Sequence, residues 1–80
     1  MQENAVRFAS NEIINFMKAW PDSADSVDGI HQWWIQWPEP AEPRAVTLAA
    51  LEQLEREGVM EVIRLAELDL WRRRRDNPQR

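Results

Sequence analysis

Side chains able to do chemistry are few in this sequence, and they are scattered. His31 is the only histidine of the 80 residues and lacks an obvious set of further metal ligands, so we expect a solvated or partly packed surface histidine. Carboxylate pairs occur at Asp22–Asp25 and Glu52–Glu55, but acid–base catalysis needs a desolvated pocket, which so short a chain does not evidently offer. There is no cysteine, and no glycine-rich loop that would cradle phosphate. We therefore expect no enzyme, no cofactor and no metal.

The arginine run RRRR is the sharpest electrostatic feature. Through Trp71 the chain has five basic and thirteen acidic residues, whereas the rest has five arginines and one aspartate, for a net charge of −4. A basic tail over 72–80 thus follows an acidic body, which should repel phosphate backbones. Arg72, Arg73, Arg74 and Arg75 are candidates for contacting nucleic acid or an acidic partner, and the plainer alternative is a solvated chain end. They would make DNA binding salt-dependent without reading base sequence.

Length and composition predict one small globular domain spanning 1–80. A domain of this size buries only about 60–65% of its unfolded surface, so a partner or self-association often adds stability. The longest apolar runs fall far short of the roughly 18 residues that cross a bilayer, and the N-terminal sequence lacks the basic start and apolar core of a signal peptide. We expect a cytoplasmic protein without membrane contact.

Two helices are predicted in the first half of the chain. Residues 5–20 carry apolar side chains at helical spacing, and Pro21 should end that helix. The inward positions are Val6, Ala9, Ile13, Phe16, Met17 and Trp20. The second helix is expected over 26–37, with Ser26 or Asp25 as its cap, and Pro38 should end it. Gly29 inside this helix suggests close approach of another helix.

Three tryptophans lie between positions 33 and 37. Trp34 and Trp37 share one helical face with Val27 and Ile30, which favours a core role over an exposed platform. We expect both to pack against the end of the first helix that carries Phe16 and Trp20, and we expect Trp33 to be the least sheltered of the three.

The third helix is predicted over 43–57. Its inward stripe is Val46, Ala50, Leu51 and Leu54, and Gly58 stands where a left-handed C-cap belongs. The opposite face combines small apolar residues with charge, as an interaction surface does. That face carries Ala45, Leu48, Ala49, Glu52, Glu55 and Arg56.

The segment 59–75 has two interpretations. Val62, Ile63, Ala66 and Leu70 allow a fourth helix, and no glycine, asparagine or proline marks a turn. The β-branched residues of VMEVIRL and the alternation from Leu68 to Trp71 instead favour a strand pair. Periodicity alone does not separate these alternatives.

The order of these elements resembles a winged helix-turn-helix domain. SVDGIHQWWI matches its second helix, RAVTLAALEQLEREGVMEV its third helix running into a strand, and IRLAELDLWRR its wing, over about residues 5–73. The resemblance implies a mainly α (α+β) fold of three helices with a C-terminal β-hairpin; the alternative is an all-α four-helix bundle. It also implies DNA binding through the third helix, but here that helix presents glutamates, which oppose base and phosphate contacts.

We therefore expect a non-catalytic winged-helix-like module that binds a protein partner or self-associates. The expected partner-binding residues are Ile35, Arg44, Ala45, Leu48, Ala49, Glu52 and Arg56. The alternative is a DNA-binding transcriptional regulator that uses Arg72–Arg75 at the edge of the wing, a function that the acidic third helix disfavours.

Overall fold

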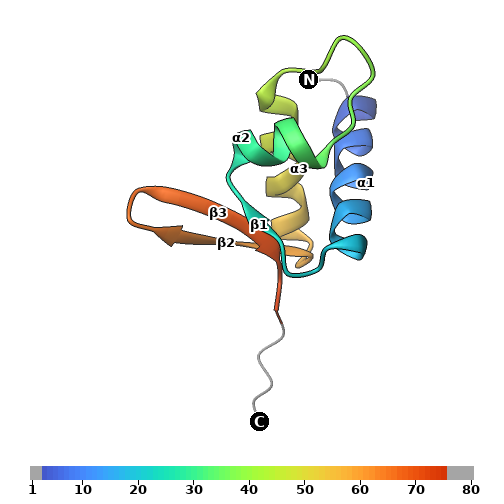
Figure 1. The fold of residues 1–80 in the computed structure, drawn as a ribbon. Helices are drawn as coiled ribbons and strands as arrows, with labels where there is room; N and C mark the ends of the chain where they lie inside the picture. The colour runs from blue at the N-terminus through green and yellow to red at the C-terminus, as the bar shows by residue number, and fades with distance from the viewer. Residues whose placement is uncertain (1–2, 76–80) are drawn as a thin grey trace.

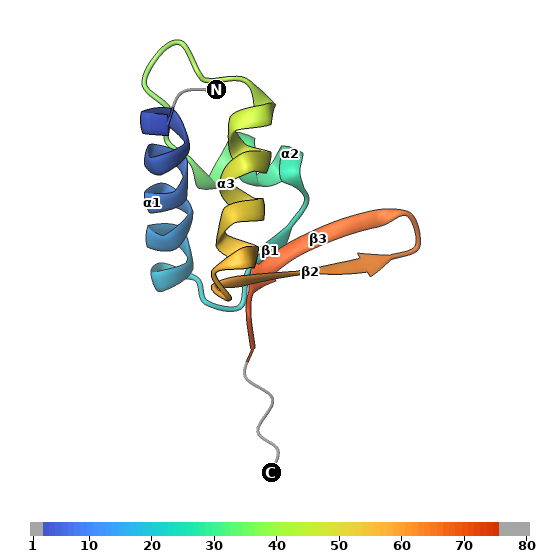
Figure 2. The ribbon, with the colours of Figure 1, turned by 180° about the vertical axis from the view of Figure 1, so that it is seen from behind.

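The computed structural model describes residues 3–75, which form three helical segments and a three-stranded antiparallel sheet (Figures 1 and 2). The protein therefore has an α+β fold. In chain order the elements are α1 (Glu3–Ala19), β1 (Ala24–Asp25), α2 (Val27–Gly29), the π-helical turn η1 (Ile30–Trp34), α3 (Arg44–Arg56), β2 (Met60–Leu65) and β3 (Leu68–Arg73). None of the described helices is long and apolar enough to span a bilayer.

Helices α1 and α3 lie side by side and form most of the core. The predicted stripe of α3 is confirmed, since all four of its members are buried: Val46, Ala50, Leu51 and Leu54. On α1 the buried residues are Ala5, Ala9, Ile13 and Met17. The inward position predicted for Trp20 is wrong, because α1 ends at Ala19 before Pro21 and leaves the Trp20 side chain 62% exposed.

The second helical segment is shorter than predicted. Ser26 caps it as expected, and its hydroxyl oxygen accepts a hydrogen bond from the Gly29 backbone N–H at 3.1 Å. The helix changes to a π-helical turn at Ile30 and ends at Trp34, three residues before the predicted end. The glycine at position 29 makes room for the Asp25 carboxylate, which a β-carbon there would overlap.

The three tryptophans have different environments. Trp34 is buried and stacks on Phe16 with ring centroids 4.5 Å apart, which confirms its predicted core position. Trp33 is 69% exposed, as expected for the least sheltered of the three. Trp37 is partly buried and packs against the core, but its predicted packing partner is wrong: its ring lies 5.6 Å from Phe8, in the other half of α1 from Phe16. The helix has already ended at Trp34, so the extended backbone carries Trp37 towards the beginning of α1.

The early end of η1 also overturns the expectation that Ile35 contacts a partner. Ile35 has an extended backbone (φ −108°, ψ 124°), and its side chain is only 3% exposed within the core. A residue of a continuing helix would point away from the core at this position. Because the backbone straightens, the side chain turns inward, and Ile35 is a core residue.

Residues 60–73 form a β-hairpin, so the alternative of a fourth helix is wrong. Gly58, with φ 78°, ends α3 as predicted. The N–H groups of Gly58 and Val59 donate to the carbonyls of Glu55 at 3.0 Å and of Leu54 at 2.9 Å, the hydrogen-bond pattern of a Schellman cap. Strand β3 is the middle strand, with β2 on one side and the two-residue β1, which was not predicted, on the other.

The contrast between Trp33 and Trp34 gives a test of the core. Replacing Trp34 by alanine removes the stack on Phe16 and leaves a cavity, so we expect the free energy of unfolding to fall by about 3–5 kcal/mol. The matched change Trp33→Ala removes an exposed side chain and should cost about 0.5 kcal/mol or less. Urea denaturation followed by far-UV circular dichroism measures both. Equal losses would contradict the assignment of Trp34 to the core.

The hairpin turn gives a second test. Ala66 is the first of the two turn residues between Leu65 and Leu68 and has φ 58°, a conformation that strains any residue with a β-carbon. Ala66→Gly should therefore raise the free energy of unfolding by about 1 kcal/mol. Glu67→Gly is the control, because Glu67 has no positive φ and should gain nothing. A loss of stability in the Ala66 variant would show that this turn conformation is not populated.

Candidate protein-interaction surfaces

The β2–β3 hairpin has two chemically different faces. Successive side chains of a strand point to opposite sides, so the register places Met60, Val62 and Trp71 on one face. Met60 and Trp71 are buried and Val62 packs against the core, which makes this the inner face. The other face carries Glu61, Ile63, Leu65, Leu68, Leu70 and Arg72. The hairpin projects away from the helices (Figures 1 and 2).

Four aliphatic residues of this second face form an exposed patch, which we call the outer hairpin face: Ile63, Leu65, Leu68 and Leu70. Leu65 and Leu68 pair across the strands and are 55% and 51% exposed. Ile63 and Leu70 form the next pair and are partly buried, but neither packs against the core cluster. A contiguous aliphatic patch on a projecting element is typical of an interaction surface.

The arginine run is divided between strand β3 and the residues after that strand. Arg72 lies within β3, and its guanidinium Nε and Nη2 both lie 2.7 Å from the Glu61 carboxylate, in a pair that is only partly exposed. Arg73 is also a strand residue, and its Nε donates to the Pro21 carbonyl at 3.4 Å. The predicted basic tail therefore begins later than position 72. Arg74 and Arg75 are exposed, and 76–80 lie outside the described residues.

The predicted partner-binding face of α3 is not one surface. Ala45, Glu52 and Arg56 are exposed as expected. Leu48 is partly buried and packs against the core, so only part of its side chain is exposed. Ala49, also partly buried, lines a groove between α1 and α3.

Arg44 and Leu48 instead border a small hollow between α2, α3 and the hairpin, of about 340 Å³. Two ion pairs occupy its rim: Arg44 Nε lies 2.6 Å from Asp28 Oδ1, and Arg64 Nε lies 2.9 Å from Asp69 Oδ1. Each rim cation is thus already matched by a carboxylate. The indole N–H of Trp71, buried behind the hollow, has no acceptor among the described residues.

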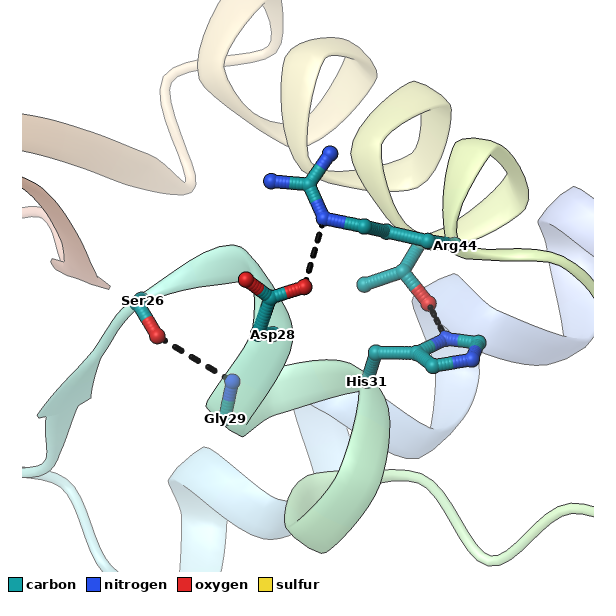
Figure 3. A network of polar contacts seen from close by, with 6 residues as sticks. Ser26, Asp28, Gly29, His31 and Arg44 are labelled. Carbon is teal, nitrogen blue, oxygen red and sulfur yellow. Dashed lines mark hydrogen bonds and ion pairs between the residues drawn. The ribbon is translucent and has the colours of Figure 1, made fainter.

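A polar network joins the second helical segment to α3 (Figure 3). His31 Nδ1 lies 2.6 Å from the hydroxyl of Thr47, the one fully buried polar residue of the core within 3–75, and the Arg44–Asp28 ion pair lies beside this hydrogen bond. The His31 carbonyl also accepts a hydrogen bond from the Trp37 indole N–H at 2.9 Å. His31 is thus held between two elements as a partly packed histidine. Among the described residues no three His, Cys, Asp or Glu side chains gather to hold a metal.

No family model, curated protein or solved structure matches this chain. The clearest of its candidate surfaces, the outer hairpin face, was missed by sequence reasoning. The alternation of side chains in VMEVIRL and LDLW indicates two strands, each with two faces, but it does not tell which of the two faces packs against the helices.

The network predicts unequal effects for its two contacts. Thr47→Val keeps the side-chain volume but removes the buried hydroxyl, and we expect a loss of about 1–2 kcal/mol in the free energy of unfolding. Asp28→Ala breaks an ion pair in water and should cost well under 1 kcal/mol, since the Asp28 and Arg44 side chains are more than half exposed. Thermal and urea unfolding measure both changes. A larger loss for Asp28→Ala would contradict this ranking.

Proposed function

We propose that this chain is a non-catalytic winged-helix-type domain that acts through protein contacts, with the outer hairpin face as its contact surface. The winged-helix assignment is supported by the helix α3 that passes through a glycine cap directly into a two-stranded hairpin. In this interpretation the hairpin is the wing. Cross-strand pairs of aliphatic residues on this hairpin form an exposed apolar surface.

The observation that carries the proposal is the exposure of Leu65 and Leu68. Each is more than half exposed at the end of a projecting hairpin, with Ile63 and Leu70 continuing the patch. Covering a half-exposed leucine contributes roughly 1 kcal/mol of binding free energy. The two half-exposed leucines, with the partly buried Ile63 and Leu70 beside them, therefore offer a partner an apolar anchor, whereas a chain that acts alone would gain nothing from exposing Leu65 and Leu68.

The charges of α3 favour a protein partner over DNA. The exposed residues near the end of α3 include Glu52, Glu55 and Glu57, which would repel phosphates in a groove. Arg44, the cation at the beginning of α3, is paired with Asp28. Arg72 is likewise paired with Glu61, so fewer arginines of the run are available for phosphates than the sequence suggests.

A photo-crosslinking amino acid at Leu68 tests the class of partner in cells that produce the protein. We expect adducts to protein and none to nucleic acid, because the crosslinker sits on the apolar patch. The matched control places it at Trp33, which is also highly exposed but lies away from the hairpin. Protein adducts should be absent or much weaker there.

A titration with duplex DNA, followed by tryptophan fluorescence at low and then moderate salt, tests the alternative. We expect no binding. Binding that is lost as salt rises, and that disappears in an Arg74→Ala/Arg75→Ala variant, would replace the proposal with a DNA-contacting function. Adducts from Leu68 to nucleic acid would lead to the same conclusion.

A further inference from the structure

We infer that the outer hairpin face packs against the outer hairpin face of a second copy of this chain, which makes the protein a weak symmetric dimer. The inference rests on the proposed function and names the partner. It is supported by three properties of the hairpin: the order of its residue pairs, its charge balance and its position in the fold.

The cross-strand pairs make the face complementary to itself. From the tip towards the base, they are Leu65 with Leu68, Ile63 with Leu70, and Glu61 with Arg72. A twofold axis parallel to the hairpin would lay β2 of one copy over β3 of the other. Leucine then meets leucine, Ile63 meets Leu70, and Glu61 of each copy meets Arg72 of the other. Every pair finds a suitable counterpart, and the charged pair closes the base of the contact.

The charge balance also favours a second copy at this place. The whole chain has a net charge of −4, so identical copies repel one another at most surfaces. The hairpin from 60 to 73 is neutral, with three carboxylates matching three arginines. By contrast, two copies approaching through α3 would bring Glu52, Glu55 and Glu57 together. The outer hairpin face is therefore an apolar surface that a copy can reach without a like-charge penalty.

The position of the hairpin makes face-to-face contact possible. The helices lie on the side of the buried Met60 and Trp71, so the opposite face points away from the body of the domain. Edge-to-edge pairing through β2, the outer strand of the sheet, would leave the leucines in water, so packing of the two faces is favoured. Four aliphatic side chains offer less than the roughly 800 Å² per partner of a standard interface, so we expect a dissociation constant above about 1 µM.

Sedimentation velocity over concentrations from about 10 µM to 1 mM tests this inference, because a weak dimer dissociates across that range. We expect a concentration-dependent shift from monomer to dimer. Leu65→Ser/Leu68→Ser should weaken dimerisation at least tenfold, while circular dichroism shows an unchanged fold, since both side chains are exposed. Trp20→Ser/Trp33→Ser is the matched control: it removes more exposed apolar surface elsewhere and should leave the dimer intact.

Exchanging charges tests the twofold arrangement. Glu61→Arg places two arginines at the base of the face, and Arg72→Glu places two glutamates there, so each variant alone should dimerise less than the parent chain. An equimolar mixture should form a heterodimer, because each base then meets the opposite charge. Each variant also loses the Glu61–Arg72 pair within its own chain, and this loss is the same in the mixture as in the separate variants. Association that is restored in the mixture therefore reports the contact between the two chains.

The outcomes separate the inference from the proposed function. If the chain stays monomeric up to 1 mM, the inference that a second copy is the partner is wrong. Crosslinked adducts from Leu68 to a different protein, recognised by a mass other than that of the dimer, would then still support a protein-binding hairpin. A dimer that the leucine variant leaves unchanged, or a charge-exchanged mixture that does not associate, also overturns the inference. Adducts to nucleic acid alone overturn the proposed function.

Discussion

The register of the β2–β3 hairpin is the constraint on which the candidate function depends. A strand alternates its side chains, so a slip of one residue would bring Ile63 to the helices and turn Met60 or Trp71 out to water. The two-residue turn at Ala66–Glu67 fixes which residues pair. Burial of Met60 and Trp71 then determines which face meets the core, and the aliphatic face is left outside as a direct consequence.

Three contacts hold the hairpin in place at its base. The glycine cap of α3 directs the chain into β2, and the Arg74 backbone N–H donates to the Val59 carbonyl at 3.0 Å, which closes the base of the strand pair. On the other edge of β3, the short β1 pairs Ala24 with Arg72 and Asp25 with Trp71. The base is therefore fixed to the end of α3 and to β1, whereas the Leu65–Leu68 pair lies at the end farthest from these contacts.

Helical periodicity was enough to predict the inner faces of α1 and α3, because each is a long regular helix with an unbroken apolar stripe. It failed where regularity ends. Trp20, Ile35 and Trp37 all lie just beyond the end of a helix, where the backbone straightens and the direction of a side chain no longer follows the helical period. Asp25 shows a related limit: its carboxylate occupies the space that Gly29 leaves, a tertiary contact that a propensity scale does not contain.

The outer hairpin face could not be predicted from periodicity alone either. Both hairpin strands alternate along their length, but alternation is symmetric, and the sequence alone allowed either face to be buried. The arginine run was visible at once, but the sequence allowed Arg72 and Arg73 to belong either to the tail or to the second strand of the wing, and the strand pairing places both in β3. Charge density is readable from sequence, whereas the partner of each charge depends on the fold.

An exposed apolar face on a neutral hairpin can bind a partner, but it also favours unspecific association. Strand β2 lies at the edge of the sheet, where exposed backbone groups and aliphatic side chains invite unspecific pairing. Glu61 and Arg64 lie on opposite faces of this strand, and each is engaged by a charge on β3, Arg72 and Asp69 respectively. Another strand added at this edge would have to accommodate both charged pairs, whereas packing onto the outer face meets only aliphatic side chains and one ion pair. The hairpin charges thus disfavour edge pairing while leaving the face open to a partner of matching shape.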